Sequence, residues 1–321
     1  MIRSSAGPGL PERTAPAPNV QNVGRRRDVS ASKYDPAVGR EPKGPDKITA
    51  AIVGAQKAGT SSLAAILGTH PDVALAQGKE AHLFDDADIQ ADGLTRQRLA
   101  QAFPNFAGER IVLDATPSYL YLPGALETLV EHNPDIRVIV VLRDPVERAF
   151  SQHGHSVRRG LEDLSFARGL LAEKSRLSGD RDPLVVDSPR RVSSYVDRGR
   201  YEIQLDRLQR LVGHVLIVRF QDFVADPATV VLAIQGFLGI AALAPPDEPM
   251  HLNRREVAVA PPRLGRAIAA LKLRRSARRT EDVLRWQPGD LRAPASSPPL
   301  IVEWPESPPR ALLDVLGPLG T

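Results

Sequence analysis

Short apolar runs alternate with segments of helical spacing through the middle of the chain. Residues 47–55 form an apolar run that ends near a glycine, which is typical of a buried strand. The stretch 60–69 begins with hydroxyl residues and then places apolar residues three and four positions apart, so it predicts a helix. By the same criteria, further strands are predicted at 72–76, 111–114, 136–143 and 215–220, and further helices at 122–132, from 145, at 201–211 and at 227–238.

Continuous Val, Ile and Leu runs that alternate with amphipathic helices are typical of a parallel sheet covered on both faces. The sequence therefore predicts an α/β protein with a P-loop-like, three-layer fold, in which a central parallel sheet is flanked by helices. The pattern extends over residues 47–285, which we predict to be one domain.

Both ends of the chain lack this pattern. Residues 1–46 contain seven prolines among Ser, Gly and Arg, so we expect a disordered N-terminal arm that cannot bury enough apolar area to offset its ordering entropy. Residues 286–321 contain eight prolines and are expected to form a poorly ordered or atypical tail. The only element predicted in that tail is a short helix at 310–316.

Composition narrows the possible functions. The chain has no cysteine, which excludes disulfides, thiolate metal sites and a thiol nucleophile. A net charge of +4 is no evidence for nucleic acid by itself, because it suits a small anionic ligand equally well. A basic cluster at 272–279 is not interleaved with aromatic residues, so no nucleic-acid partner is predicted. No apolar run is long enough to span a bilayer, and residues 1–20 lack the apolar core of a signal peptide. We therefore predict a cytoplasmic protein.

A glycine-containing loop follows the first predicted strand and opens the first predicted helix. Gly54 and Gly59 allow close approach of the backbone, and the unpaired N–H groups of a helix N-terminus favour an anion. The spacing resembles the pattern G-x-x-x-x-G-K-[ST], but Thr60 stands at the lysine position and the lysine is Lys57, inside the loop. This placement favours a phosphate-like group over a magnesium-bound nucleoside triphosphate. The alternative is a helix N-terminus with incidental glycines.

A second anion site is predicted where the strand at 136–143 ends. Arg143 lies at the carboxyl end of that strand, where open α/β sheets bind ligands, and its guanidinium suits a phosphate. Ser151 follows about two helical turns later. The alternative is that Asp144 caps the helix, Pro145 takes its first position and Arg143 forms a solvated ion pair.

Residues 54–63 and 142–151 together resemble the sulfotransferases that use 3′-phosphoadenosine 5′-phosphosulfate (PAPS). The resemblance is greatest to the carbohydrate, heparan-type branch and its bacterial relatives. It continues through 76–85, 116–119, 199–205 and 237–239 in the order expected for the family, and it covers about residues 47–240. It implies a PAPS-dependent transferase that moves a sulfuryl group to an acceptor hydroxyl, with a small molecule, carbohydrate or glycoconjugate as the acceptor.

The family's roles can be transferred to the matching positions. The loop would hold the 5′-phosphosulfate of PAPS, while Arg143 and Ser151 would hold its 3′-phosphate. The loop residues concerned are Lys57, Ala58, Gly59, Thr60, Ser61 and Ser62. Lys57 would also stabilise negative charge on the leaving phosphate, and Glu80 matches the general base. No metal is required.

The acceptor side is less defined by the sequence. Glu80 could instead be an exposed carboxylate beside Lys79. His82 is expected to contact the acceptor, with an orienting role or a role as rival base as alternatives. Tyr119 is also expected to bind the acceptor. Asp114 could line the same cleft or satisfy backbone groups near a following proline.

Several positions depart from the heparan-type pattern. Gln56 stands where those enzymes have an arginine, and Ala115 where they have a lysine. These changes remove two cations near the sulfuryl group and argue against a heparan-like polyanion as acceptor. Asn253, Arg254 and Arg255 are the candidates for contact with adenine. The tail after Trp286 also lacks the usual pattern of the family.

Two other function classes stay open at this point. A P-loop kinase would need lysine at position 60 and a magnesium-binding acid where Arg143 stands. A catalytically weak cofactor or glycan binder would fit the change at Ala115 and the atypical tail. The sequence does not indicate an oligomeric state.

Overall fold

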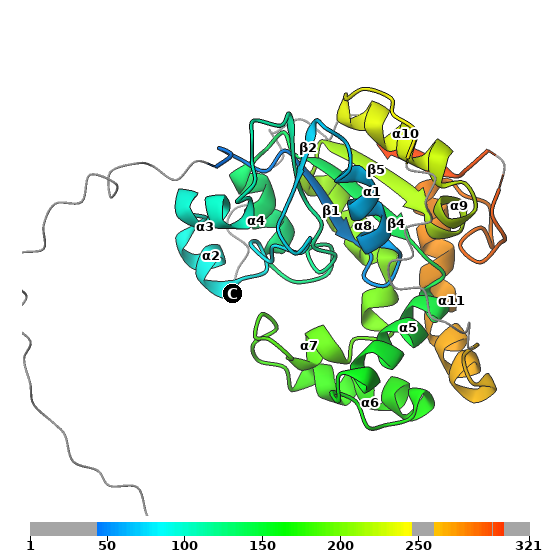
Figure 1. Ribbon diagram of the computed structural model, residues 1–321. Coiled ribbons are helices and arrows are strands. Elements are labelled where there is room, and N and C mark those ends of the chain that lie inside the picture. Colours follow the sequence, from blue (N-terminus) through cyan, green and yellow to red (C-terminus); the bar gives the residue numbers. More distant parts are fainter. Residues whose placement is uncertain (1–43, 246–259, 297, 305–321) are drawn as a thin grey trace, which may run out of the picture. The chain divides into compact units, whose positions relative to one another are not determined.

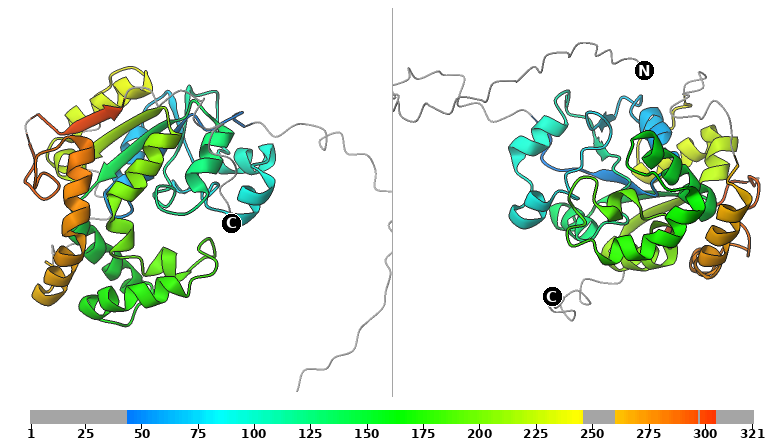
Figure 2. Two further views of the ribbon diagram at one scale, coloured as in Figure 1. Left: turned by 180° about the vertical axis from the view of Figure 1, so that it is seen from behind. Right: turned by 90° about the horizontal axis from the view of Figure 1, so that it is seen from below.

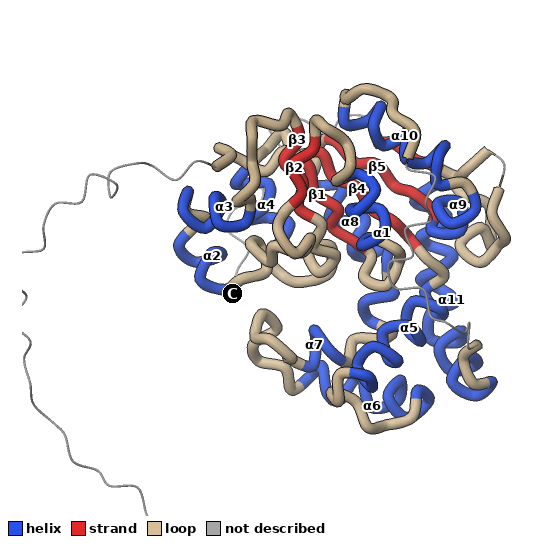
Figure 3. Tube along the Cα trace, viewed as in Figure 1, coloured by secondary structure: helices blue, strands red, loops and turns tan. Residues whose placement is uncertain are grey.

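The computed structural model describes residues 44–245, 260–296 and 298–304. These residues contain one six-stranded sheet with the strand order β2-β3-β1-β4-β5-β6, which Figure 3 shows as the red elements between blue helices. The strands are β1 (Ala50–Gly54), β2 (Val73–Leu75), β3 (Ile111–Asp114), β4 (Arg137–Leu142), β5 (His214–Arg219) and β6 (Ile301–Trp304). All neighbours are parallel except β5 and β6, which are antiparallel.

The central strands explain the unbroken apolar runs. Every residue of β1 and β3 is buried, as are the last five residues of β4. Strands β4 and β5 pair in continuous register from Arg137 opposite His214 to Leu142 opposite Arg219. Because both faces of such strands are covered, their residues need not alternate between apolar and polar.

Helices cover both faces of the sheet (Figures 1 and 2). On one face, α1 (Thr60–Leu67) contacts α10 (Pro227–Leu238), and α9 (Phe220–Ala225) and α10 contact β5. On the other face, α8 (Tyr201–Leu211) contacts both α4 (Ala125–His132) and α11 (Arg263–Leu284). The predicted three-layer α/β arrangement is therefore confirmed.

A second group of helices lies beyond the carboxyl end of β4. It contains α5 (Pro145–Arg158), α6 (Phe166–Ser178), α7 (Pro189–Val192) and the 3-10 helix η1 (Asp197–Gly199). Side chains from α5, α6 and α11, among them Ala149, Phe166 and Leu273, form a small hydrophobic core of their own. This group supplies one side of the cavity described below. The short helices α2 (Ala87–Asp92) and α3 (Arg96–Ala102) follow β2.

The structure refines two sequence expectations. The predicted central parallel sheet is present, and β6 adds a strand at its edge that pairs antiparallel with β5. This strand lies in the segment 286–321, which we predicted to be a poorly ordered or atypical tail because of its prolines. Its four residues fit between Pro299 and Pro305, since an edge strand tolerates flanking prolines. The fifth predicted strand also ends one residue early, at Arg219, because Phe220 begins α9.

Some of the other predicted elements have the expected bounds, and others fall on residues that the structure does not describe. The helices predicted at 201–211 and 227–238 have those bounds in α8 and α10. The basic cluster at 272–279 lies within α11. Nearly all of the N-terminal arm, the candidate adenine contacts Asn253, Arg254 and Arg255, and the helix predicted at 310–316 lie outside the described residues. No helix in the described part of the chain is both long and apolar enough to cross a membrane.

Candidate active site

The glycine-containing loop joins β1 to α1 at the carboxyl edge of the sheet. Lys57 and Gly59 adopt left-handed backbone conformations, with φ of 71° and 82°. Gly59 is the N-cap of α1, and a Cβ atom there would lie 2.9 Å from the Phe220 ring. The first N–H groups of a helix have no intrahelical acceptor, so this end of α1 can bind an anion.

Arg143 contacts this loop. Its Nη1 donates a hydrogen bond to the carbonyl oxygen of Lys57 at 3.0 Å, and its guanidinium lies 4.9 Å from the centre of the Phe220 ring. The Tyr201 hydroxyl donates to the Arg143 carbonyl at 3.0 Å. The two anion-binding elements predicted from the sequence, 86 residues apart, are therefore in direct contact.

The remaining predicted donor-site residues lie in the loop, on α1 and on α5. Ala58 and Thr60 are buried, while Ser62 is half-buried near the start of α1. Ser151 is half-buried on α5. That helix begins as predicted, because Asp144 accepts hydrogen bonds from the N–H groups of Val146 and Glu147 at 2.7 and 2.9 Å. The capping role of Asp144 and an anion-binding role for Arg143 are therefore compatible.

Lys79 connects the donor loop to the candidate base. Its Nζ donates to Ser61 Oγ at 2.7 Å and also forms an ion pair with Glu80. Lys79 has a left-handed backbone, with φ of 76°. Glu80 is therefore held next to the first turn of α1, rather than standing as an isolated exposed carboxylate.

Glu80, His82 and Asp85 form a chain of ion pairs. His82 Nε2 lies 3.4 Å from Glu80 Oε2, and His82 Nδ1 lies 3.1 Å from Asp85 Oδ2. Asp85 is fully buried and also accepts hydrogen bonds from Ser118 Oγ at 2.6 Å and from Arg191 Nη1 at 2.8 Å. Asp85 thereby fixes the imidazole that contacts Glu80.

These contacts set the charge of each group. Burial raises the pKa of Glu80, but hydrogen bonds from His82 and Lys79 outweigh it, so the net pKa is lowered. The hydrogen bonds from His82 to Asp85 and Glu80 raise the pKa of His82 to about 9. Asp85 has a pKa lowered to about 2, because His82, Ser118 and Arg191 together outweigh its burial. At neutral pH, Glu80 is therefore an ionised carboxylate beside an imidazolium.

The structure contradicts the predicted role of Tyr119 in acceptor binding. The side chain is fully buried, so it cannot reach an acceptor. Its hydroxyl donates to Asp114 Oδ2 at 2.6 Å and accepts from the Leu83 N–H at 2.9 Å. Asp114 also accepts from Thr116 Oγ1 and from the Ala81 N–H. Tyr119 and Asp114 therefore anchor the segment that carries Glu80 and His82.

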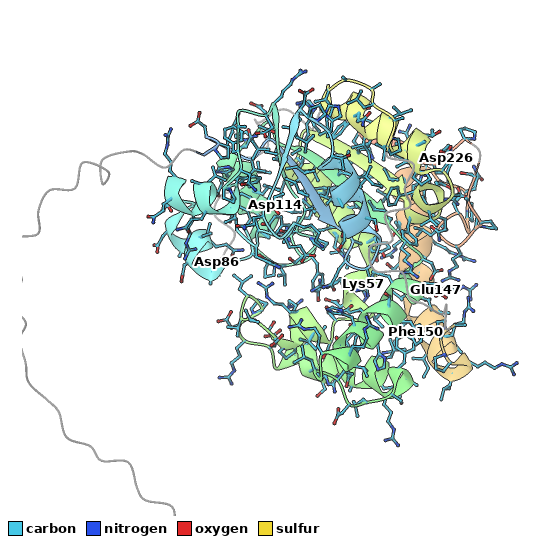
Figure 4. All side chains as sticks on the ribbon, in the orientation of Figure 1. Lys57, Asp86, Asp114, Glu147, Phe150 and Asp226 are labelled. Atoms are coloured by element: carbon cyan, nitrogen blue, oxygen red, sulfur yellow. The ribbon has the colours of Figure 1, made fainter. Side chains whose placement is uncertain are left out.

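A cavity of about 740 Å³ opens beside Glu80 and His82. Gln56 of the donor loop and His155 of α5 line it as well. Burial and the nearby positive charge of Lys57 lower the pKa of His155, while Glu80 acts on it in the opposite direction. Figure 4 labels Lys57 of the loop and Asp86, the N-cap of α2, which also lines the cavity. The glycine-containing loop and the candidate base Glu80 thus meet at one cavity.

Sequence reasoning assigned no role to several residues of this cavity. Asp85 ends the segment 76–85 that resembles the family, but the sequence does not show that its side chain is buried. Arg191 is 106 residues from Asp85, and no local pattern links the two. Arg198 of η1 also lines the cavity, although it follows a segment without regular periodicity. Among the described residues, no group of three or more His, Asp and Glu could hold a metal ion.

Comparisons with known proteins agree on one family. Residues 77–245 match the sulfotransferase family. Heparan sulfate glucosamine 3-O-sulfotransferase 3B1 of Mus musculus is 29% identical over 78% of this chain and 64% of its own length. Heparan sulfate glucosamine 3-O-sulfotransferase 6 of Homo sapiens is 33% identical over 60% of this chain and 52% of its own length. The chain therefore spans about half to two thirds of these curated relatives.

A solved structure supports the same assignment. The crystal structure of a sulfotransferase from Alicyclobacillus acidocaldarius has a TM-score of 0.62 and 28% identity, over 77% of this chain and 99% of that one. Its fold agrees with the mostly parallel sheet flanked by helices described above. The family match covers more than half of the chain, and the chain belongs to the sulfotransferase family.

Proposed function

We propose that this protein transfers a sulfuryl group from PAPS to a hydroxyl group of a carbohydrate or glycoconjugate. The observation that carries the proposal is the position of Glu80. Lys79 connects this carboxylate to the first turn of α1, where an anionic donor would bind, and the carboxylate faces a cavity large enough for an acceptor. The sugar acceptors named for the curated relatives support a carbohydrate as the acceptor class.

The residues of the donor side fit PAPS. A PAPS molecule carries two separated anionic groups and supplies the sulfuryl group when bound. The loop with Lys57 and the α1 N-terminus would bind the 5′ group, and Arg143 with Ser151 would bind the 3′-phosphate. The hydrogen bond from Arg143 to the Lys57 carbonyl supports this assignment, because it joins the loop to the end of β4. Arginine binds phosphate through paired N–H donors, whereas a P-loop kinase would need a magnesium-binding acid at this strand end.

Glu80 acts as the general base in this proposal. Its ionised form can accept a proton from the attacking hydroxyl, which is far too weak an acid to lose that proton in water at neutral pH. His82 orients Glu80 and holds it ionised, so its role is positioning rather than rival base, because its own pKa keeps it protonated. Lys57 and the helix N-terminus stabilise negative charge on the phosphate side. No metal enters this scheme.

Calorimetry tests the proposal directly. The full chain is titrated with 3′,5′-phosphoadenosine (PAP) and, separately, with ATP. We expect tighter binding of PAP, because only PAP presents a 3′-phosphate to Arg143. Equal or tighter binding of ATP would contradict the proposal and favour a P-loop kinase. PAP binding without release of PAP from PAPS in the presence of any acceptor would favour a catalytically weak binder.

A further inference from the structure

The cavity beside Glu80 has an apolar wall. It is formed largely by the segment between α6 and α7 and by the start of the loop after α5. Its apolar lining residues are Leu161, Leu184, Val185, Val186 and Val192. Val185 and Val186 are 54% and 75% exposed, which leaves apolar surface open to the cavity instead of packed in a core. An acceptor with an apolar part would remove this surface from water.

This wall is fixed relative to the reacting groups. Arg191 donates from Nε and Nη2 to the Leu184 carbonyl, at 3.1 and 3.0 Å, and from Nη1 to Asp85. One guanidinium therefore joins the apolar segment to the residue that orients His82. Asp187, at the far end of the segment, pairs with Arg159 at 3.2 Å.

The carboxylates that line the cavity are all paired with basic side chains, and among the lining arginines Arg159 and Arg191 take part in these pairs. Each lining carboxylate has a basic partner within 4.0 Å. The pairs are Glu80–His82, Asp85–Arg191, Asp86–Arg98, Asp88–Arg98 and Asp187–Arg159. A polyanionic saccharide would need several unpaired cations here, and it would also face five carboxylates.

Two lining polar groups lack partners among the described residues. Gln56 Oε1 is a buried acceptor, and Arg198 Nη1 is a buried donor on a side chain that is 2% exposed. Arg198 is otherwise held by Ser194 Oγ and by the Arg190 carbonyl. A buried polar group gains most from a ligand that completes its hydrogen bonds. Sugar hydroxyls both donate and accept, so they can satisfy groups of both kinds.

Building on the proposed sulfuryl transfer, we propose that the acceptor is an amphipathic glycoconjugate of low charge, in which a sugar hydroxyl faces Glu80 and an attached apolar group lies against Val185 and Val186. The apolar wall favours binding of the attached apolar group, and the paired carboxylates disfavour binding of a polyanion. Gln56 and Arg198 select for hydroxyl groups on the sugar.

Alkyl glycosides of increasing chain length test this inference. The full chain and PAPS are assayed for PAP release with methyl, hexyl and octyl β-glucosides and β-galactosides below micelle formation, and with heparan sulfate. We expect kcat/KM to rise about tenfold or more from methyl to octyl, because each buried methylene favours binding. Titration of the octyl glycosides into the PAP-bound protein should give the same order of affinity without turnover.

A matched pair of variants locates the effect. Val185→Asp places a charge in the apolar wall and should lower the octyl-to-methyl ratio of kcat/KM about tenfold. Val224→Asp, at a valine on α9 that is 48% exposed and does not line the cavity, should leave that ratio as it is. An equal loss in both variants would contradict the assignment of the wall.

The outcomes separate this inference from the proposed function. Weak PAP binding would overturn the sulfuryl-transfer proposal itself. With PAP binding intact, preference for heparan sulfate, independence of chain length, or transfer to heparan sulfate but to no alkyl glycoside would overturn the acceptor class alone. PAP binding without transfer to any acceptor would overturn the proposed function.

Discussion

The two sides of this site are built in different ways. The proposed donor side, comprising residues 54–62 and Arg143, is formed by consecutive residues where β1 ends and α1 begins, together with one side chain that follows β4. The proposed acceptor side, comprising the cavity around Glu80, depends on side chains from segments far apart in the chain, such as Asp85 and Arg191. The backbone N–H groups of the loop should tolerate changes in the loop side chains, whereas the contact with the 3′-phosphate depends on the Arg143 side chain. On the acceptor side, every contact depends on a side chain.

The largest effect is expected from removing the base. Glu80→Gln keeps the size of the side chain but removes its ability to accept a proton, so the rate of sulfuryl transfer should fall by about 10²–10⁴-fold. PAP affinity should change little, which would separate the acceptor side from the donor side. The matched control is Glu131→Gln, on the exposed surface of α4. Full transfer activity in Glu80→Gln would show that another group is the base.

The second effect concerns donor affinity. Arg143→Ala removes charge-assisted hydrogen bonds, which are worth about 1.5–3 kcal/mol, so PAP affinity should fall about 10- to 100-fold by calorimetry. Arg137→Ala, at the opposite end of β4, is the control and should bind PAP normally. If both variants bound PAP like the wild type, the donor side would lie elsewhere.

A smaller effect should appear where the two sides meet. Lys79→Met removes the hydrogen bond and the charge that lower the pKa of Glu80, so that pKa should rise. The loss of activity on acidification should then begin at a higher pH than in the wild type, as measured by pH profiles of kcat. Lys47→Met, near the start of β1 and hydrogen-bonded to Asn133, provides the control. Unchanged profiles would mean that Lys79 does not act on the base.

The smallest effect is one of stability and concerns the acceptor side alone. A histidine whose pKa rises from 6.5 to about 9 on folding stabilises the folded state fully below pH 6.5, and this contribution disappears as the pH rises through about 9. The difference in melting temperature between wild type and His82→Gln should therefore be greatest at pH 6 and should diminish towards pH 10. Because His82 is half-exposed, solvent will keep the difference modest. A constant difference would indicate that His82 is not charged by its neighbours.

The contact between the glycine-containing loop and Arg143 was predictable because both elements have local signals. An apolar run, a loop with Gly59 and Lys57, and a helix start follow each other directly, and Arg143 ends the most regular strand of the chain. Strand ends in a parallel sheet meet at one edge, so sequence order alone predicts that these groups converge. The acceptor side was not predictable to the same degree. Nothing local distinguishes the buried Tyr119 from a residue that lines a cleft, and the contact between Asp85 and Arg191 depends on tertiary packing.

The fold shows the same division. Strands and helices with clear periodicity were predicted close to their observed bounds. The edge strand β6 was not, because a four-residue strand between prolines carries little periodic signal. Helices α6 and α7 were also not identified, since the packing of α6 against α5 and α11, and of α7 against α6, determines them more than their own pattern does.

The left-handed backbone at Lys57, Lys79 and His82 has a consequence for evolution and engineering. An L-residue in this conformation costs about 1–2 kcal/mol, whereas glycine adopts it freely and loses only about 0.5–1 kcal/mol of chain entropy on folding. Glycine at these positions would relieve the backbone cost, but at Lys79 and His82 it would also remove the ion pairs with Glu80 and Asp85. The unfavourable backbone conformation is therefore kept where the side chain contacts the proposed base.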